Sequence, residues 1–495
     1  MLLVGVDLGT SSVKMLLMEE NGDIKKIVTR EYPLSIPRPG WSEQNPEDWW
    51  NAFKDGLAEL LSEADHSQVA GISFSGQMHG LVILDGEDNV IRPAILWNDG
   101  RTQKECDYLN KTIGREKISS YTGNMALTGF TAPKILWVKE NEPENFAKIN
   151  KIMLPKDYIA YRLSGVHCTD VSDASGMLLL DVKNKKWSKE MLELCSINES
   201  QLAKLHESYE AVGTLTAAIA AELDLPQTVK VVAGGGDQAV GAVGTGTVGH
   251  GMCSVSLGTS GTVFIVSKEF AVDDANALHS FAHADGQFHF MGCTLAAAAS
   301  NKWWMDEIIR TTAYGDEQKG ITNDKLGKNG VYYLPYLMGE RTPINNPNAR
   351  GTFTGLMMNT SREDMTQAVL EGVAFSLRDA LEIARSFGVT IDRIRINGGG
   401  SKSPLWCKIM ANVMNVKVDK INSAEGPAFG AAILAAVGCG FYPSVKDATS
   451  KLISVVETTE QDADLVALYD KRYQVWKQLY PAMKDVFDVM AEAEV

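Results

Sequence analysis

The sequence is short of positive charge, of closely spaced cysteines and of long apolar runs. Its 495 residues contain 47 lysines and arginines against 62 aspartates and glutamates, a formal net charge of −15. An acidic chain without a basic block is a poor partner for nucleic acid or for an anionic membrane surface. We therefore expect neither as a partner.

Cysteine occurs only seven times, and no two cysteines form a CxxC pair. This pattern is typical of a reduced intracellular protein rather than of a disulfide framework. The apolar start MLLVGVDLG lacks a basic segment and is interrupted by Asp7, unlike a signal peptide. The small apolar run at 428–438 is too short to span a bilayer and predicts a buried helix. We expect a cytoplasmic protein, and the length indicates two or more domains.

The tetrapeptide LGTS occurs twice, at 8–11 and at 257–260. Each copy lies between two apolar stretches, which predicts a strand, a short turn and a second strand. After the first copy, Asn21-Gly22 predicts a hairpin turn into a further strand, so three antiparallel strands are expected at the start.

A second pattern also recurs: an apolar strand, three glycines and a helix, at 229–244 and again at 394–406. Two features in the same order favour a duplicated α/β domain, with insertions mainly in the first copy. Coincidence among common turns in a glycine-rich chain is the alternative. We predict domains at 1–246 and 247–495, packed tightly around a cleft because no Pro- or Ser-rich linker separates them. Amphipathic helices are predicted from Asn45 and over 361–388.

The two Gly-Thr-Ser turns are candidate phosphate-binding sites. Such turns offer backbone N–H groups and hydroxyls without a bulky side chain in the way. The chain has no GxxxxGK[ST] motif, and DLGTSS leads into a strand, which argues against a P-loop enzyme and a dinucleotide-binding fold. Two turns facing one another across a cleft would suit a nucleoside triphosphate. For either turn alone, an ordinary hairpin is the simpler interpretation. The residues are Gly9, Thr10 and Ser11, and Gly258, Thr259 and Ser260.

Two acidic residues end predicted strands beside these glycine turns. Asp7 could hold Mg²⁺ directly or through water, or it could simply cap its turn. Asp237 follows three glycines, where a carboxylate can accept a hydroxyl proton during phosphoryl transfer. From the residues alone, capping the following helix is an equally good interpretation of Asp237.

Histidines raise two further questions. His79 and Gln77 lie in the polar turn SGQMHG and could bind the hydroxyls of a sugar, although a surface turn is the simpler interpretation. His279, His283 and His289 lack the spacing of a helical HExxH metal site, so packing or surface roles are favoured.

The motifs DLGTSSVK, GQMHG, WNDGRT, GFTAPKILWVKEN, MLPKDY, AGGGDQ, SLGTSG, LPYLMGERTP, NGGGSKS and EGPAFGAA follow one another along the chain. In kind and order they resemble the FGGY carbohydrate kinases over nearly the whole chain. This resemblance implies an α/β fold with two related domains of the actin, Hsp70 and hexokinase (ribonuclease H-like) type. It also implies ATP and Mg²⁺ bound in the interdomain cleft, and a small sugar as substrate.

The resemblance also implies roles for individual residues. Asp237 matches the catalytic base, Met78 and His79 the sugar contacts, and Asp7 an acid near Mg²⁺ and the phosphates. The two Gly-Thr-Ser turns match the phosphate loops. Ser12 and Gln238 are small departures from the family pattern. A kinase for gluconate or another ketose, a nucleotide-switched protein like actin or Hsp70, and a homodimer stay open. The segment 425–430, together with Gly398, Gly399, Gly400 and Ser401, matches the part of the family's nucleotide site that binds adenosine.

Overall fold

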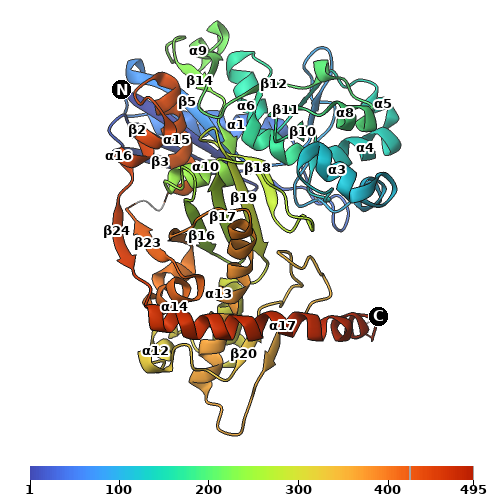
Figure 1. Ribbon diagram of the computed structural model, residues 1–495. Coiled ribbons are helices and arrows are strands. Elements are labelled where there is room, and N and C mark those ends of the chain that lie inside the picture. Colours follow the sequence, from blue (N-terminus) through green and yellow to red (C-terminus); the bar gives the residue numbers. More distant parts are fainter. Residues whose placement is uncertain (423–424, 494–495) are drawn as a thin grey trace.

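A computed structural model describes residues 1–422 and 425–493. The chain forms two α/β bodies, with the blue-to-green first half above the largely orange second half in Figure 1. Each body is built on a seven-stranded mixed sheet. The first sheet has the order β13-β14-β5-β1-β2-β3, with β15 beside β5, and the second has the order β18-β19-β17-β16-β22-β23-β24.

The strands of the first sheet are β1 (Leu2–Leu8), β2 (Ser12–Glu19), β3 (Ile24–Glu31), β5 (Val69–Gly76), β13 (Ala211–Thr214), β14 (Lys230–Val232) and β15 (Gly235–Gly236). Those of the second are β16 (Cys253–Leu257), β17 (Gly261–Ser267), β18 (His279–Ala282), β19 (Phe288–Thr294), β22 (Arg393–Asn397), β23 (Lys417–Ile421) and β24 (Val455–Thr459).

The three predicted N-terminal strands are confirmed. β1 is antiparallel to β2, from Leu2 opposite Glu19 to Leu8 opposite Val13, and β2 is antiparallel to β3. The other edge of β1 runs parallel to β5, which places Asp7 beside Ser75. The first Gly-Thr-Ser turn therefore lies at the end of the central strand, where two strand ends meet.

The second sheet repeats this arrangement, as expected for a duplicated domain. β16 is antiparallel to β17 and parallel to β22, as β1 is to β2 and β5. One detail of the predicted repeat is wrong. The pairing makes β22 equivalent to β5, so NGGGSKS occupies the position of SGQMHG, while the counterpart of AGGGDQ is the segment after β23. The two glycine triplets look alike, but they follow strands with different neighbours.

The helices predicted from capping signals are confirmed. The side chain of Asn45 accepts the backbone N–H of Glu47 at the start of α1 (Pro46–Leu61). Ser361 and Asp364 form a reciprocal capping box at the start of α13 (Arg362–Ser386). A side-chain cap satisfies N–H groups that the first helical turn leaves without partners, so its sequence signature marks the boundary well.

Two helices connect the two bodies. α15 (Gly426–Cys439) follows the second sheet along the chain but packs in one apolar cluster with Leu3 and Leu16 of the first sheet. In Figure 1 it lies among the blue strands. α10 (Asp237–Gly244) contributes Ala242 to a small cluster with Phe264 of β17. A Cβ atom on Gly244 would lie 1.8 Å from the carbonyl oxygen of Gly426, so the two helices touch backbone to backbone.

Insertions enlarge both halves, although we expected them mainly in the first. The segment between β5 and β13 forms a lobe with its own apolar core, into which Phe281 of β18 packs. The second half gains a segment between β19 and α13 and a long final helix, α17 (Ala463–Ala493). Among the described residues, no helix combines the length and apolar character needed to cross a membrane. Further helices that position the site are α3 (Arg115–Thr122), α4 (Thr131–Asn141), α6 (Pro155–Ser164), α7 (Val171–Ala174), α12 (Tyr314–Lys319) and α14 (Pro404–Met414).

Candidate active site

A cavity of about 450 Å³ lies where α10, α15 and the second sheet meet. It is lined by Asp237, by the second Gly-Thr-Ser turn and by Gly398. These groups come from three separate parts of the sequence, and all were predicted as site residues. The structure thus brings the candidate base and one candidate phosphate turn to the same cavity.

A second cavity, of about 780 Å³, begins at Thr259 and extends along the glycine turn after β22. Gly399, Gly400, Trp406 and residues of α12 form its walls. The hydroxyl of Ser401 instead donates to the carbonyl oxygen of Gly398 at 2.7 Å, which closes the turn. Because Thr259 lines both cavities, a molecule with a polyanionic end and a flat apolar end could extend from one into the other.

The first Gly-Thr-Ser turn is held from outside by side chains that the sequence did not single out. The amide nitrogen of Gln44 donates to the carbonyl of Thr10 at 2.6 Å, and Trp97 Nε1 donates to Thr10 Oγ1 at 3.0 Å. Gln44 also accepts hydrogen bonds of 3.0 Å from Trp49 and from Gln77. Gln77 is buried, and its amide nitrogen supports this turn. Its predicted contact with a sugar stays a prediction.

Asp7 and Asp237 place two carboxyl groups in the cleft. Burial raises the pKa of Asp7 to about 6, although a 3.0 Å hydrogen bond from Ser75 and the charge of Lys14 act in the opposite direction. Burial, together with repulsion from Asp7, raises the pKa of Asp237 to about 7. Two weakly compensated carboxyl groups suit a cation that keeps most of its own water, as Mg²⁺ does. Among the described residues, no group of three or more His, Cys, Asp or Glu side chains forms a site that could hold a metal ion.

His79 presents a defined hydrogen-bond acceptor. Its Nδ1 lies 2.7 Å from the carbonyl oxygen of Gly176, so Nδ1 carries the hydrogen and Nε2 is left to accept. Burial and the nearby ammonium group of Lys134 lower the pKa of His79 to about 3, so the ring is neutral at physiological pH. Met78 packs against Gly236, where a Cβ atom would lie 2.9 Å from its sulfur. Met78 therefore lies against the glycine before Asp237, and His79 is the next residue of the same turn.

Behind the glycine turn lies a buried charge network that sequence reasoning missed. Lys156 of α6 is fully buried, with its Nζ 2.7 Å from Asp157 and 3.0 Å from Asp170. Ser172 of α7 donates to Asp170 at 2.5 Å and accepts the backbone N–H of Gly236 at 3.2 Å. The network thus fixes the residue immediately before Asp237. The lysine in MLPKDY was the available sequence signal, because a buried lysine requires acidic partners.

The histidines at positions 279, 283 and 289 lie in packed positions. His279 stacks on Phe281 with ring centroids 5.3 Å apart, and His289 stacks on Phe264 at 4.1 Å. His283 Nε2 lies 3.1 Å from the carbonyl oxygen of Thr247. These contacts agree with the packing interpretation of the three residues.

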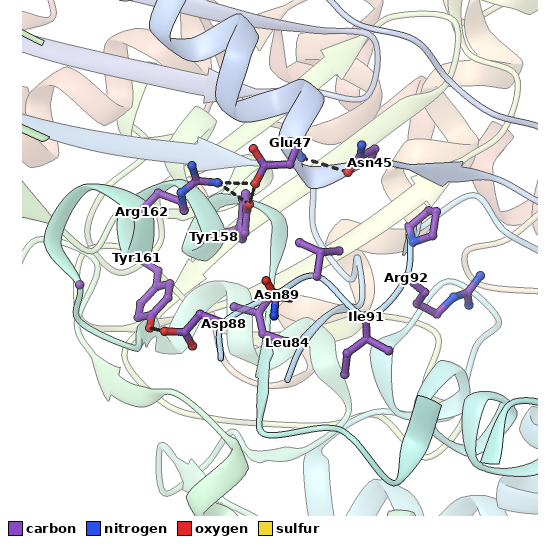
Figure 2. A pocket seen from close by; sticks show the side chains of 13 residues that line it. Asn45, Glu47, Leu84, Asp88, Asn89, Ile91, Arg92, Tyr158, Tyr161 and Arg162 are labelled. Atoms are coloured by element: carbon purple, nitrogen blue, oxygen red, sulfur yellow. Dashed lines mark hydrogen bonds and ion pairs between the residues drawn. The ribbon is translucent and has the colours of Figure 1, made fainter. Parts of the chain in front are cut away.

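A further cavity, of about 860 Å³, lies outside the cleft and is drawn in Figure 2. Several of its polar groups bind one another: Arg162 contacts Glu47 and Tyr158, and the hydroxyl of Tyr161 donates to Asp88 at 2.6 Å. It shares no residue with the predicted site, so it adds nothing to the chemistry of the cleft.

Two related α/β domains with a polyanion-sized cavity between them and a carboxylate at its edge define a nucleotide-dependent phosphotransferase. The comparisons identify which one. Residues 2–244 match the N-terminal domain of the FGGY family of carbohydrate kinases, and residues 253–439 match its C-terminal domain. The chain belongs to the FGGY family of carbohydrate kinases and is an ATP-dependent sugar kinase, which confirms the family and fold predicted from its motifs.

Individual relatives agree with this assignment. The chain is 38% identical to the xylulose kinase of Bacillus subtilis, covering 98% of this chain and 97% of that protein. The crystal structure of a xyloylose kinase from Brucella ovis superimposes with a TM-score of 0.92 at 39% identity, covering 98% of this chain and all of that one. A gluconate kinase from Lactobacillus acidophilus has the same fold, with a TM-score of 0.92 at 24% identity and 99% of each chain covered. The fold alone therefore does not select the sugar.

Proposed function

We propose that this kinase transfers the γ-phosphoryl group of ATP to the terminal hydroxyl of D-xylulose, giving D-xylulose 5-phosphate and ADP. The observation that carries the proposal is the position of Asp237, which lines the cavity of the second phosphate turn and directly follows the glycine against which Met78 packs. The sugar is inferred from the xylulose kinases that resemble the chain over nearly its whole length.

Asp237 is the proposed general base. Its carboxylate takes the proton of the terminal hydroxyl as the oxygen attacks the γ-phosphorus, and ADP leaves on the opposite side. A pKa raised to about 7 suits this role near neutral pH, because the group is ionised in a large fraction of molecules and is still basic enough to accept a proton. Ser172 holds the preceding glycine and so limits the motion of the carboxylate.

Sugar and nucleotide occupy neighbouring positions in this proposal. Neutral His79 accepts a hydrogen bond from a sugar hydroxyl at Nε2, which orients the chain of the sugar toward Asp237. The backbone N–H groups of the two Gly-Thr-Ser turns bind the phosphates, and the 780 Å³ cavity receives the adenosine. Asp7 would hold Mg²⁺ through water, where the ion neutralises phosphate charge.

Another ketose or gluconate is the alternative substrate, because a gluconate kinase shares the fold. Membership of a carbohydrate kinase family leaves the nucleotide-switch alternative without support.

A coupled assay of ADP release with MgATP tests the proposal across a panel of ketoses and sugar acids. We expect the highest kcat/KM for D-xylulose and slow ATP hydrolysis without sugar. Asp237→Ala should abolish most sugar phosphorylation while ATP affinity stays near that of the wild type. Asp464→Ala, at an exposed helix start in α17, is the matched control and should behave as the wild type. A preference for gluconate would show that D-xylulose is not the main substrate. Normal turnover in Asp237→Ala would show that Asp237 is not the general base.

A further inference from the structure

A third cavity, of about 300 Å³, lies where the inserted lobe of the first half meets the second domain. One wall comes from Arg115 at the start of α3 and from Asn124, Met125 and Leu127. The opposite wall comes from 275–277, from His279 and from the loop at 341–345. Anything bound there would contact both parts of the molecule.

The ionisable groups that line this cavity favour an anion. Its walls contain two arginines and no aspartate or glutamate, in a chain whose net charge is −15. Two of the adjacent carboxylates are engaged by other groups. Asp273 accepts backbone N–H groups at 275, 277 and 278. Glu340 accepts the backbone N–H of Leu295 at 3.1 Å and a hydrogen bond from Thr294.

Arg341 is held by its backbone while its side chain is available. Its own N–H donates to Glu340 at 2.7 Å, and the next residue, Thr342, bonds to Cys293 through both its backbone and its hydroxyl. Within the described part of the chain, no hydrogen bond or ion pair engages the guanidinium group of Arg341, which is exposed. Arg115 makes one long contact, 3.4 Å, to the carbonyl oxygen of Asp274. Both arginines can therefore turn to a ligand at little cost.

Aromatic rings connect this cavity to the candidate sugar site. The ring of Phe130 lies 4.8 Å from that of His79 on one side and 5.7 Å from that of His279 on the other. Burial is the main cause that lowers the pKa of both histidines, and the charge of Arg341 acts in the same direction on each. The cavity is thus a neighbour of the sugar site, separated from it by a wall one ring thick.

We propose that this cavity binds a small phosphate-bearing anion, either free phosphate or a phosphate monoester, between Arg115 and Arg341. Guanidinium groups bind tetrahedral oxyanions through paired, charge-assisted hydrogen bonds. The volume is at the lower end for a ligand pocket and suits a phosphate with a few further atoms. Because the two arginines belong to the two sides of the cleft, the anion draws the lobe and the second domain together.

Calorimetric titration of the whole protein tests the site, with constant ionic strength and a saturating non-hydrolysable ATP analogue to occupy the phosphate turns. Inorganic phosphate should bind, and Arg341→Met and Arg115→Met should each weaken binding at least about tenfold. Arg341→Lys keeps the positive charge, so its affinity for phosphate should lie between that of the methionine variants and that of the wild type. Arg310→Met, an exposed arginine outside the cavity, is the control and should leave the affinity unchanged. The Tm of each variant shows whether it is folded.

A second titration, with ribose 5-phosphate as the ligand, distinguishes a sugar phosphate from free phosphate. Tighter binding than that of inorganic phosphate identifies a sugar phosphate as the ligand, and equal binding identifies free phosphate. Absence of binding to the wild type up to about 10 mM overturns the proposal. Equal binding to the wild type and to both methionine variants overturns it as well. The titration does not involve catalysis, so its failure is distinct from a wrong assignment of the sugar.

Discussion

Asp237→Asn should remove activity and increase stability at the same time. The substitution keeps the shape of the side chain but deletes the proton acceptor, so kcat should fall by about 10²–10⁴-fold. The same carboxylate is costly to bury when ionised, since burial and repulsion from Asp7 raise its pKa from 3.8 to about 7. At about 1.4 kcal/mol for each tenfold change in proton affinity, this rise corresponds to at most about 4 kcal/mol. Because the side chain keeps some solvent contact, we expect about 2 kcal/mol in practice.

The sign of the pH dependence follows from the raised pKa. The folded protein holds this proton more tightly than the unfolded chain does, so the wild type gains stability as the pH falls from about 7 toward 4. The asparagine variant lacks this gain. Its advantage over the wild type should therefore be greatest above pH 7 and shrink as the pH falls.

Thermal unfolding between pH 5 and 8 measures this difference. At pH 8 the variant should unfold a few degrees above the wild type. Asp464→Asn, at an exposed position, should show no such difference at any pH. A variant that is less stable than the wild type at pH 8, or a difference that does not change with pH, would refute the reasoning.

Three further changes test other parts of the site. His79→Gln should raise the KM for the sugar about tenfold but keep the acid limb of kcat/KM near pH 7, because an imidazole with a pKa of about 3 is not the titrating group. If the decrease of kcat/KM at acid pH disappeared in this variant, His79 rather than Asp237 would be the titrating group. Gly244→Ala should lower Tm and activity because its Cβ atom would lie 1.8 Å from a backbone oxygen, whereas Gly86→Ala, with nothing within 4 Å, should do neither. Gln44→Ala should raise the KM for ATP by loosening the turn at Thr10, and an unchanged KM in initial-rate measurements would show that the turn does not need this support.

Local patterns predicted much of the fold because their causes are local. The strands around each LGTS turn and the helix starts at Asn45 and Ser361 depend on neighbours within a few residues. The equivalence of the two glycine triplets was wrong because it depends on which strands pair, and pairing joins segments far apart in the sequence.

The candidate site shows the same division. Asp237, the second phosphate turn and Gly398 were predicted from motifs, and the structure gathers them around one cavity. Gln44 and Ser172 were missed, although they hold the first turn and the glycine before Asp237. Each acts on a residue more than thirty positions away through a single hydrogen bond, and such a contact leaves no periodicity in the sequence.

The glycine contact between α10 and α15 has a consequence for the protein as a whole. Because α15 belongs to the second half of the chain but covers strands of the first, a chain cut after α10 would leave that face of the first sheet open to water. Each half is therefore expected to aggregate when it is produced alone and to regain solubility when both are produced together. The two halves are therefore interlocked, and where α10 meets α15 their backbones come into direct contact.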